Sequence, residues 1–136
     1  MNRAGIRGVL SRAAACVSIA LIVACSKGGA PAGGADEIVL GFSQIGAESE
    51  WRTANTNSIR SAAAEAGITL KFSDAQQKQE NQIKALRSFI AQRVDVIAFS
   101  PVVETGWETV LREAKAAKIP VILTDRAVEV SDDSLY

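Results

Sequence analysis

The chain has 136 residues, which is enough for at most one ordinary domain. Its 15 basic and 15 acidic residues cancel, so the positive charge typical of nucleic-acid-binding proteins is absent. Histidine is missing and there are only two cysteines, which excludes the usual zinc sites and a cysteine nucleophile. We therefore expect no metal, no cofactor and no nucleic acid partner.

The N-terminal residues predict export and attachment to a lipid. Three arginines precede the apolar stretch Ala13–Ala24, which is too short to span a bilayer comfortably. This stretch ends in Ile22-Val23-Ala24-Cys25, which resembles the lipobox of bacterial lipoproteins. The resemblance implies that residues 1–24 are a signal peptide and that the Cys25 sulfur is diacylated. Secretion without a lipid and an uncleaved membrane anchor remain the alternatives.

Residues 25–36 are predicted to be a flexible tether, because they are rich in Gly, Ala and Pro and lack a hydrophobic pattern. Once the three arginines of the signal are removed, 12 basic residues remain against 15 acidic ones, a net charge of about −3. With Cys16 removed and Cys25 lipidated, the mature chain would carry no thiol and no disulfide. This organisation is typical of a globular body held close to a membrane.

From residue 37 onward, four apolar strand-like runs alternate with three helix-like runs. The predicted strands are Ile38–Phe42, Ile68–Phe72, Val94–Phe99 and Val121–Leu123. The predicted helices lie near Glu50–Ala66, Lys78–Gln92 and Gly106–Ala117. Because the strands are continuously apolar, both sheet faces should be covered, as in a parallel α/β sheet with right-handed crossovers.

Residue spacing indicates which helix faces are buried and where the helices end. The second helix has Ile83, Leu86 and Ile90 on one face. The third helix carries a good apolar stripe along one face, formed by Trp107, Val110, Leu111 and Ala114. Gly67 should close the first helix, Thr105-Gly106-Trp107-Glu108 fits a capping box, and Pro120 should stop the third helix.

About 100 residues remain after the tether, and a domain of that size buries only a marginal core. We therefore expect residues 37–136 to be part of a longer protein.

The loop Gly41–Arg52 is the strongest candidate for a binding site. It follows the first strand and contains the amide of Gln44, the carboxylate of Glu48, the indole of Trp51 and the guanidinium of Arg52. An aromatic ring can stack on a sugar, while the charged groups form strong hydrogen bonds with its hydroxyls. These side chains suit a polyhydroxylated ligand.

Asp125 and Arg126 are the second candidate, because they follow the fourth strand. Ligands of open parallel sheets bind at the carboxyl ends of the strands, so both candidates should lie on the same edge. Each also has an ordinary structural interpretation. Glu48 and Arg52 could form a surface ion pair, and Asp125 and Arg126 a salt bridge to a helix.

Other polar and aromatic residues suggest packing or solvation more than binding. We expect Trp107 to pack in the core, and the polar run Gln76–Gln82 to form a solvated helix start. For Trp51, the sequence favours neither packing nor ligand binding over the other. No pair of carboxylates has a recognisable acid/base arrangement, so we expect the protein not to be an enzyme.

Three stretches of the chain carry a family resemblance: GFSQIGAESEWRTANTNSI, the segment from DAQQKQENQIKA to PVILTDR, and the terminal SLY. Over about Ile38–Tyr136 the chain is similar to sugar-binding proteins of bacterial ABC importers, in the type I periplasmic binding protein family. The likeness is strongest to members that bind galactofuranose. It implies that residues 37–136 form an incomplete N-terminal lobe, a parallel sheet with helices on both faces.

The resemblance also implies a function. Two lobes would close on one monosaccharide, galactofuranose, and the closed, monomeric protein would deliver it to ABC permease subunits. Glu48, Arg52, Asp125 and Arg126 would contact the sugar, and Trp51 and Gln44 would also belong to the ligand-binding residues. Trp51 and Phe42 would form a nearby wall or support. The protein would lie in the periplasm or cell envelope, anchored to a bacterial membrane by lipid. The lipobox and Ala127, where a polar residue is usual, depart from the family pattern.

Other functions compatible with this fold remain as alternatives. A sugar sensor that feeds a membrane histidine kinase or chemoreceptor is the main one. A transcription repressor is disfavoured, because an export signal occupies the place of a helix-turn-helix. An exported enzyme comes last.

Overall fold

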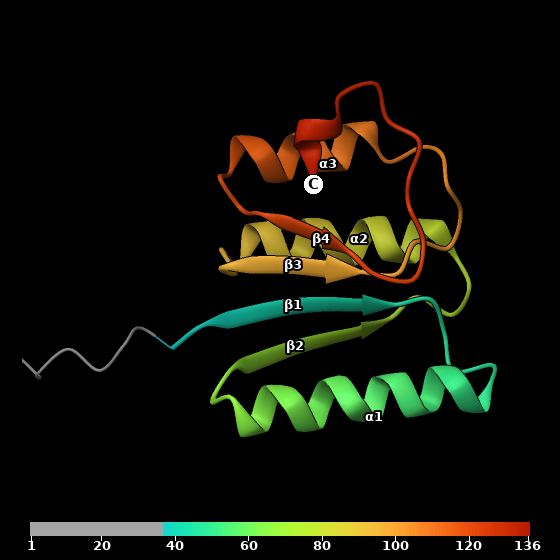
Figure 1. Ribbon diagram of the computed structural model, residues 1–136. Coiled ribbons are helices and arrows are strands. Elements are labelled where there is room, and N and C mark those ends of the chain that lie inside the picture. The colour runs from blue at the N-terminus through green and yellow to red at the C-terminus, as the bar shows by residue number, and fades with distance from the viewer. Residues whose placement is uncertain (1–36) are drawn as a thin grey trace, which may run out of the picture. The chain divides into compact units, whose positions relative to one another are not determined.

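A four-stranded parallel sheet, in the order β2-β1-β3-β4, forms the centre of the computed structural model, which describes residues 37–136 (Figure 1). The predicted signal peptide, the tether and the lipidation site Cys25 lie outside the described residues. Within the described part of the chain, no helix is both long enough and apolar enough to cross a membrane.

The elements follow one another in the predicted alternation. The strands are β1 (Val39–Gln44), β2 (Thr69–Asp74), β3 (Val96–Phe99) and β4 (Val121–Leu123). The helices are α1 (Glu50–Glu65), α2 (Gln79–Ala91) and α3 (Glu108–Ala116), and a short 3-10 helix, η1 (Asp133–Leu135), follows β4.

Helices cover both faces of the sheet, as predicted. Successive residues of a strand point to opposite faces. On one face, Phe89 of α2 packs so closely against Gly41 of β1 that a Cβ at Gly41 would lie 2.6 Å from its ring. On the other face, Gln44 of β1 bonds to Asn55 of α1. Glycine at position 41 therefore allows α2 to lie tightly against the sheet.

Most of the buried core lies between the sheet and the helices α2 and α3. The predicted stripe of α3 is confirmed: Trp107, Val110, Leu111 and Ala114 are all buried. On α2 the buried stripe is rotated from the predicted one. Its members are Gln82, Ala85, Leu86 and Phe89, whereas Ile83 and Ile90 are only partly buried. The rotation brings Phe89 over Gly41 and places an amide, Gln82, in the core.

Two local predictions are wrong at the ends of elements. The strand β1 extends to Gln44, because Ser43 and Gln44 pair with Ser73 and Asp74 of β2. The helix α3 has Trp107 at its N-cap, without a side-chain cap, so the expected capping box is absent. The carboxylate of Glu108 instead accepts hydrogen bonds from Ser131.

Two other end signals agree with the structure. Gly67 follows α1 with φ +68°, the left-handed conformation that suits glycine after a helix. The helix α3 ends at Ala116, before Pro120.

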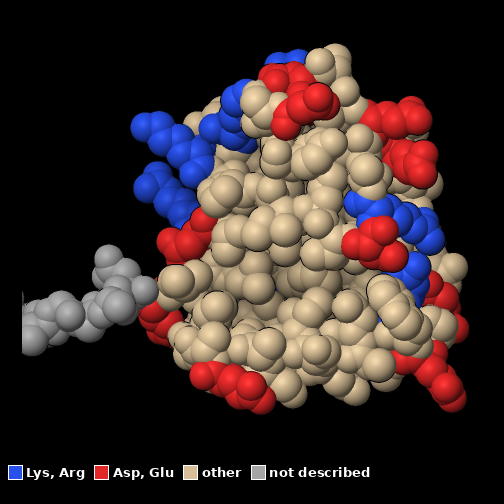
Figure 2. Space-filling model, in the orientation of Figure 1, with Lys and Arg blue, Asp and Glu red and all other residues tan. Residues whose placement is uncertain are grey.

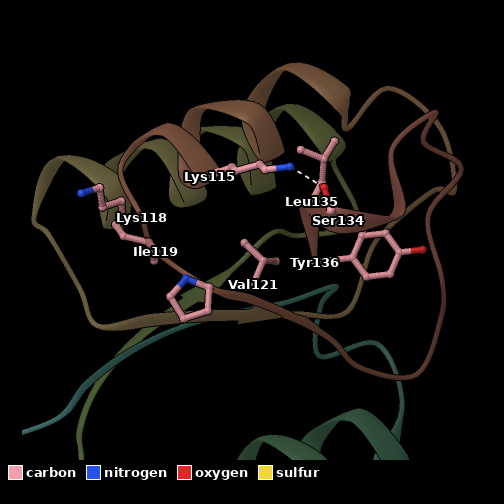
Figure 3. A pocket seen from close by; sticks show the side chains of 8 residues that line it. Lys115, Lys118, Ile119, Val121, Ser134, Leu135 and Tyr136 are labelled. Carbon is pink, nitrogen blue, oxygen red and sulfur yellow. Dashed lines mark hydrogen bonds between the residues drawn. The ribbon is translucent and has the colours of Figure 1, made fainter.

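The segment after β4 folds back against α3. Leu135 of η1 is buried, and the ammonium of Lys115 on α3 bonds to Ser134 of η1 (Figure 3). Lys115 also lies 3.3 Å from the carboxylate of Asp132. A cavity of about 340 Å³ separates η1 from the start of β4, and Tyr136 contributes to its lining. The last residues are thus held by one buried leucine and a set of surface polar contacts.

We expect acid to loosen this C-terminal segment. Hydrogen bonds from Ser134 and the nearby Lys115 lower the pKa of Asp132 from 3.8 to about 2. Because the folded-state pKa is depressed, the ionised carboxylate stabilises docking above the unfolded value, and this contribution disappears as the pH falls through the folded pKa. The chemical shift of the Ser134 amide, followed by NMR as the pH is lowered, should change with a midpoint near pH 2. A midpoint at the ordinary value, or an unchanged titration in Asp132→Asn, would contradict this.

Candidate functional site

The carboxyl ends of the strands bring together the two predicted parts of the site. The chain moves from β1 to β2 on one side and then to β3 on the other, so the switch point of the sheet lies between β1 and β3. The loop after β1 and the loop after β4 both emerge at this edge. Figure 2 shows basic and acidic side chains next to each other at the edge toward which the strands point in Figure 1. The sheet topology therefore places the predicted residues at the position typical of ligand sites.

Glu48 and Arg52 form the first contact of the site. Arg52 Nε lies 2.5 Å from Glu48 Oε1. Glu48 precedes the helix, and Ser49 is the N-cap, with its side chain accepting from the Arg52 backbone N–H at 3.3 Å. The cap fixes the first turn of α1 and thereby the direction of the guanidinium. The ion pair that the four-residue spacing of Glu48 and Arg52 allows is thus present.

Asp125 links this pair to the end of β4. Its Oδ2 atom lies 3.8 Å from Arg52 Nη1 and 3.8 Å from Arg126 Nε. The backbone of Asp125 is left-handed, with φ 70°, a conformation that aspartate tolerates better than most residues. The alternating series Glu48, Arg52, Asp125, Arg126 thus joins two segments that are far apart in the sequence.

Arg52 is the buried member of this series and is incompletely partnered. Only 8% of the residue is exposed, and its Nη1 group has no hydrogen-bond partner in the structure. Buried charged donors are normally satisfied, because an unmet hydrogen bond at such a group costs about 1–3 kcal/mol or more. An additional acceptor, such as an oxygen of a ligand or a small approach of Asp125, would complete the coordination of this guanidinium.

The two tryptophans lie in opposite environments. Trp107 is fully buried, with its ring 4.8 Å from that of Phe99, which confirms the packing interpretation. Trp51 is 55% exposed at the start of α1, and the Arg52 guanidinium lies 5.5 Å from its ring centre. An exposed indole beside a charged cluster provides a flat apolar surface at the rim of the site.

Gln44 is in a different position from the other predicted residues. It is almost completely buried, and its amide nitrogen donates to Asn55 at 2.8 Å while its oxygen accepts from the Ile45 N–H at 3.0 Å. Both polar ends of the side chain are therefore occupied within the protein. The structure connects Gln44 to α1, the helix that carries Arg52.

A further set of polar residues lies beneath this edge, and sequence reasoning missed one of them, Gln82. The hydroxyls of Ser100 and Thr124 lie 2.8 Å apart and join the ends of β3 and β4. Gln82 is buried beneath the loop that follows β3. The signal for Gln82 was its spacing, since it lies four residues before the buried Leu86 on the same helix face.

Other parts of the described region offer weaker candidates. The cavity in Figure 3 is lined by the end of α3, the start of β4 and η1, and it contains none of the predicted site residues. Residues 37–136 contain no group of three or more His, Cys, Asp or Glu side chains that could hold a metal ion. The charged edge is thus the best-supported site.

Comparisons with known proteins agree with this architecture. A family model described as a periplasmic binding protein domain matches residues 40–136. The chain is 63% identical over 99 residues to the galactofuranose-binding protein YtfQ of Escherichia coli (strain K12), covering 73% of this chain and 31% of that protein.

Two solved structures are also similar to this chain, in both sequence and fold. A Mycobacterium smegmatis protein in complex with β-D-fucofuranose is 68% identical, with a TM-score of 0.72 over 73% of this chain and 33% of that one. The periplasmic binding component of the arabinose ABC transporter from Shewanella sp. ANA-3, bound to α- and β-L-arabinofuranose, is 62% identical. Its TM-score is 0.71 over 72% of this chain and 32% of that one.

The chain spans about a third of the length of these relatives. They are binding proteins rather than enzymes, in agreement with the sequence prediction. The predicted fold class is confirmed, because the sheet and its helices match part of the N-terminal lobe of these proteins. The chain therefore belongs to the periplasmic binding protein family.

Proposed function

We propose that residues 37–136 supply the first half of a sugar site in a solute-binding protein of an ABC importer, and that the sugar is a furanose, galactofuranose in particular. The relatives named above bind galactofuranose, fucofuranose or arabinofuranose. The complete protein would have a second lobe, and the sugar would be held between the two.

The observation that carries this proposal is the incompletely partnered Arg52. Its guanidinium is buried, charged and held by Glu48 on one side, while its Nη1 group has no hydrogen-bond partner. A sugar hydroxyl can accept from a guanidinium and donate to a carboxylate in the same arrangement. The alternating acids and bases at this edge therefore match the donors and acceptors of a polyol.

The predicted residues would then have distinct tasks. Arg52 and Arg126 would donate to sugar oxygens, and Glu48 and Asp125 would accept from hydroxyls and orient the two guanidinium groups. Trp51 would contribute an apolar wall at the rim. We assign Gln44 to the support of α1 and not to direct contact, because both ends of its side chain are already bonded.

The mechanism would be binding and closure, without bond formation. An open edge with partly exposed Asp125 and Arg126 holds a ligand weakly, since water competes for every hydrogen bond. Closure of a second lobe would remove that water and complete the coordination of the sugar. The closed form would then be the one that docks on the permease.

Calorimetric titration of the full-length protein with a panel of pentoses and hexoses tests this proposal. We expect galactofuranose or a related furanose to bind most tightly, and Arg126→Ala to weaken binding by about tenfold, the usual effect of one charge-assisted hydrogen bond. The described residues alone should bind much more weakly. Unchanged affinity in Arg126→Ala, or full affinity in the 136-residue chain, would contradict the proposal.

We also propose that the protein is anchored to the membrane through Cys25, with residues 1–24 as signal peptide and 25–36 as tether. The support is the sequence Ile22-Val23-Ala24-Cys25, which follows an apolar stretch. Metabolic labelling with radioactive palmitate in a bacterial host should label the protein but not Cys25→Ser. Equal labelling of the variant, or an unlabelled wild type, would contradict the anchor.

A further inference from the structure

A buried glutamine on α2 connects the ends of β1 and β3. Gln82 has no exposed surface. Its Nε2 group donates to the Ser100 carbonyl at 2.6 Å and lies 3.5 Å from the Ser43 carbonyl. Its Oε1 atom accepts from the Val102 N–H at 2.9 Å. One side chain thus uses both its donor and its acceptor to hold the loop that follows β3.

The same loop supports Arg126. The Val102 carbonyl accepts a hydrogen bond from Arg126 Nη1 at 3.4 Å, and the N–H of the same residue is the group that Gln82 holds. The hydroxyl of Ser100 bonds to that of Thr124, two residues before Arg126. The contacts of Gln82 therefore lead to the end of β4 by two short routes.

From this geometry we propose that Gln82 is a positioning residue of the sugar site, which acts through the Val102 carbonyl to set the direction of the Arg126 guanidinium. The inference rests on the proposed function, because it assumes that Arg126 contacts the sugar. Gln82 itself is buried below the edge and does not reach the ligand.

The chemistry of the contacts requires an amide at this position. The Ser100 carbonyl needs a donor and the Val102 N–H needs an acceptor, and a glutamine side chain offers both at the correct separation. Methionine has a similar length but provides neither a strong donor nor a strong acceptor. Glutamate keeps the acceptor and, when ionised, loses the donor. Substitution should let the loop shift, so that Arg126 loses the carbonyl that holds it.

A matched control lies on the same helix. Gln79 also bonds to this loop, with its Nε2 group 2.6 Å from the Thr105 carbonyl, but it is only half-buried and its partner does not contact Arg126. Gln82→Met and Gln79→Met make the same chemical change in two amides of α2. Only the first is expected to affect the sugar site.

The test is a set of affinity measurements on the full-length protein by calorimetry. We expect Gln82→Met to weaken furanose binding by about tenfold, and Gln79→Met to change it by less than about twofold. In a double-mutant cycle, adding Gln82→Met to Arg126→Ala should cost less than about twofold, because the effect of Gln82 passes through Arg126. The same cycle with Trp51→Ala should be additive.

Three results would overturn the inference. Wild-type affinity in Gln82→Met, with a loss in Arg126→Ala, would overturn it and leave the proposed function intact. Additivity of Gln82→Met with Arg126→Ala would show that Gln82 stabilises the fold in general. Unchanged binding in Arg126→Ala, or no sugar binding by the wild type, would overturn the proposed function as well. If Gln82→Met does not fold, Gln82→Glu serves in the same cycle with the same expected coupling.

Discussion

Replacement of Arg52 by alanine should reduce the affinity of the full-length protein for its sugar by about 100-fold or more, as expected when hydrogen bonds to a charged group are lost. Arg52 is the most buried charge at the carboxyl edge of the sheet, and its Nη1 group still lacks an acceptor. Its removal also leaves Glu48 and Asp125 without their shared cation. The two carboxylates would then repel each other, because no positive charge remains between them.

Two further variants make this result specific. Arg52→Lys keeps the positive charge but loses the planar fork, so it should recover only part of the affinity. Arg87→Ala makes the same substitution at a surface position. Arg87 on α2 pairs with Glu113 on α3, and both side chains are well exposed. This variant should bind sugar normally, since such surface pairs contribute little. An Arg52→Ala protein within about threefold of the wild type would refute the central role of this guanidinium.

Replacement of Trp107 by alanine should lower the free energy of unfolding by about 3–5 kcal/mol, the range measured for large aromatic residues in cores. Trp107 is fully buried against Phe99, and its Nε1 group donates to the Val103 carbonyl at 2.7 Å. The variant would create a cavity beneath α3 and release the end of the loop that follows β3. Urea denaturation followed by circular dichroism measures the change.

Trp107→Phe separates packing from hydrogen bonding. It keeps most of the buried ring but loses the donor to Val103, so we expect a smaller loss of about 1–2 kcal/mol. Val103→Ala is the surface control: its side chain is well exposed, and the free energy of unfolding should change by less than about 0.5 kcal/mol. Equal stability of Trp107→Ala and the wild type would show that this part of the core contributes little.

The fold was predictable because it depends on patterns that lie within short stretches of sequence. The strands are apolar on both faces, and this is a direct consequence of a parallel sheet that is covered on both sides. The stripe Trp107, Val110, Leu111, Ala114 is a local periodicity, and burial of that face stabilises α3 wherever the helix lies. One error lies inside an element, on the buried face of α2, where packing on the sheet rotated the predicted stripe. The others lie where an element ends, as at Glu108, whose carboxylate is bonded by a distant residue, Ser131.

The candidate site was predictable only in part. Glu48 and Arg52 are four residues apart, so their pairing followed from local geometry. Whether that pair was a surface ion pair or part of a site could not be decided locally. The proposed site is supported by Asp125, which approaches Arg52 from a segment more than seventy residues away. Gln44 was predicted to bind the ligand because it lies in the same loop. In the structure it is buried and its side chain bonds to Asn55 of α1.

The sequence by itself determined the order and type of the elements, the apolar faces of α3, the pairing of Glu48 with Arg52, and the absence of histidine and cysteine chemistry from residues 37–136. These properties depend on composition and on neighbours along the chain. Only the tertiary structure decided that Asp125 meets Arg52, and that Gln82 is a core residue rather than part of a solvated helix face. The physical reason is that burial and charge pairing depend on which segments the sheet places side by side.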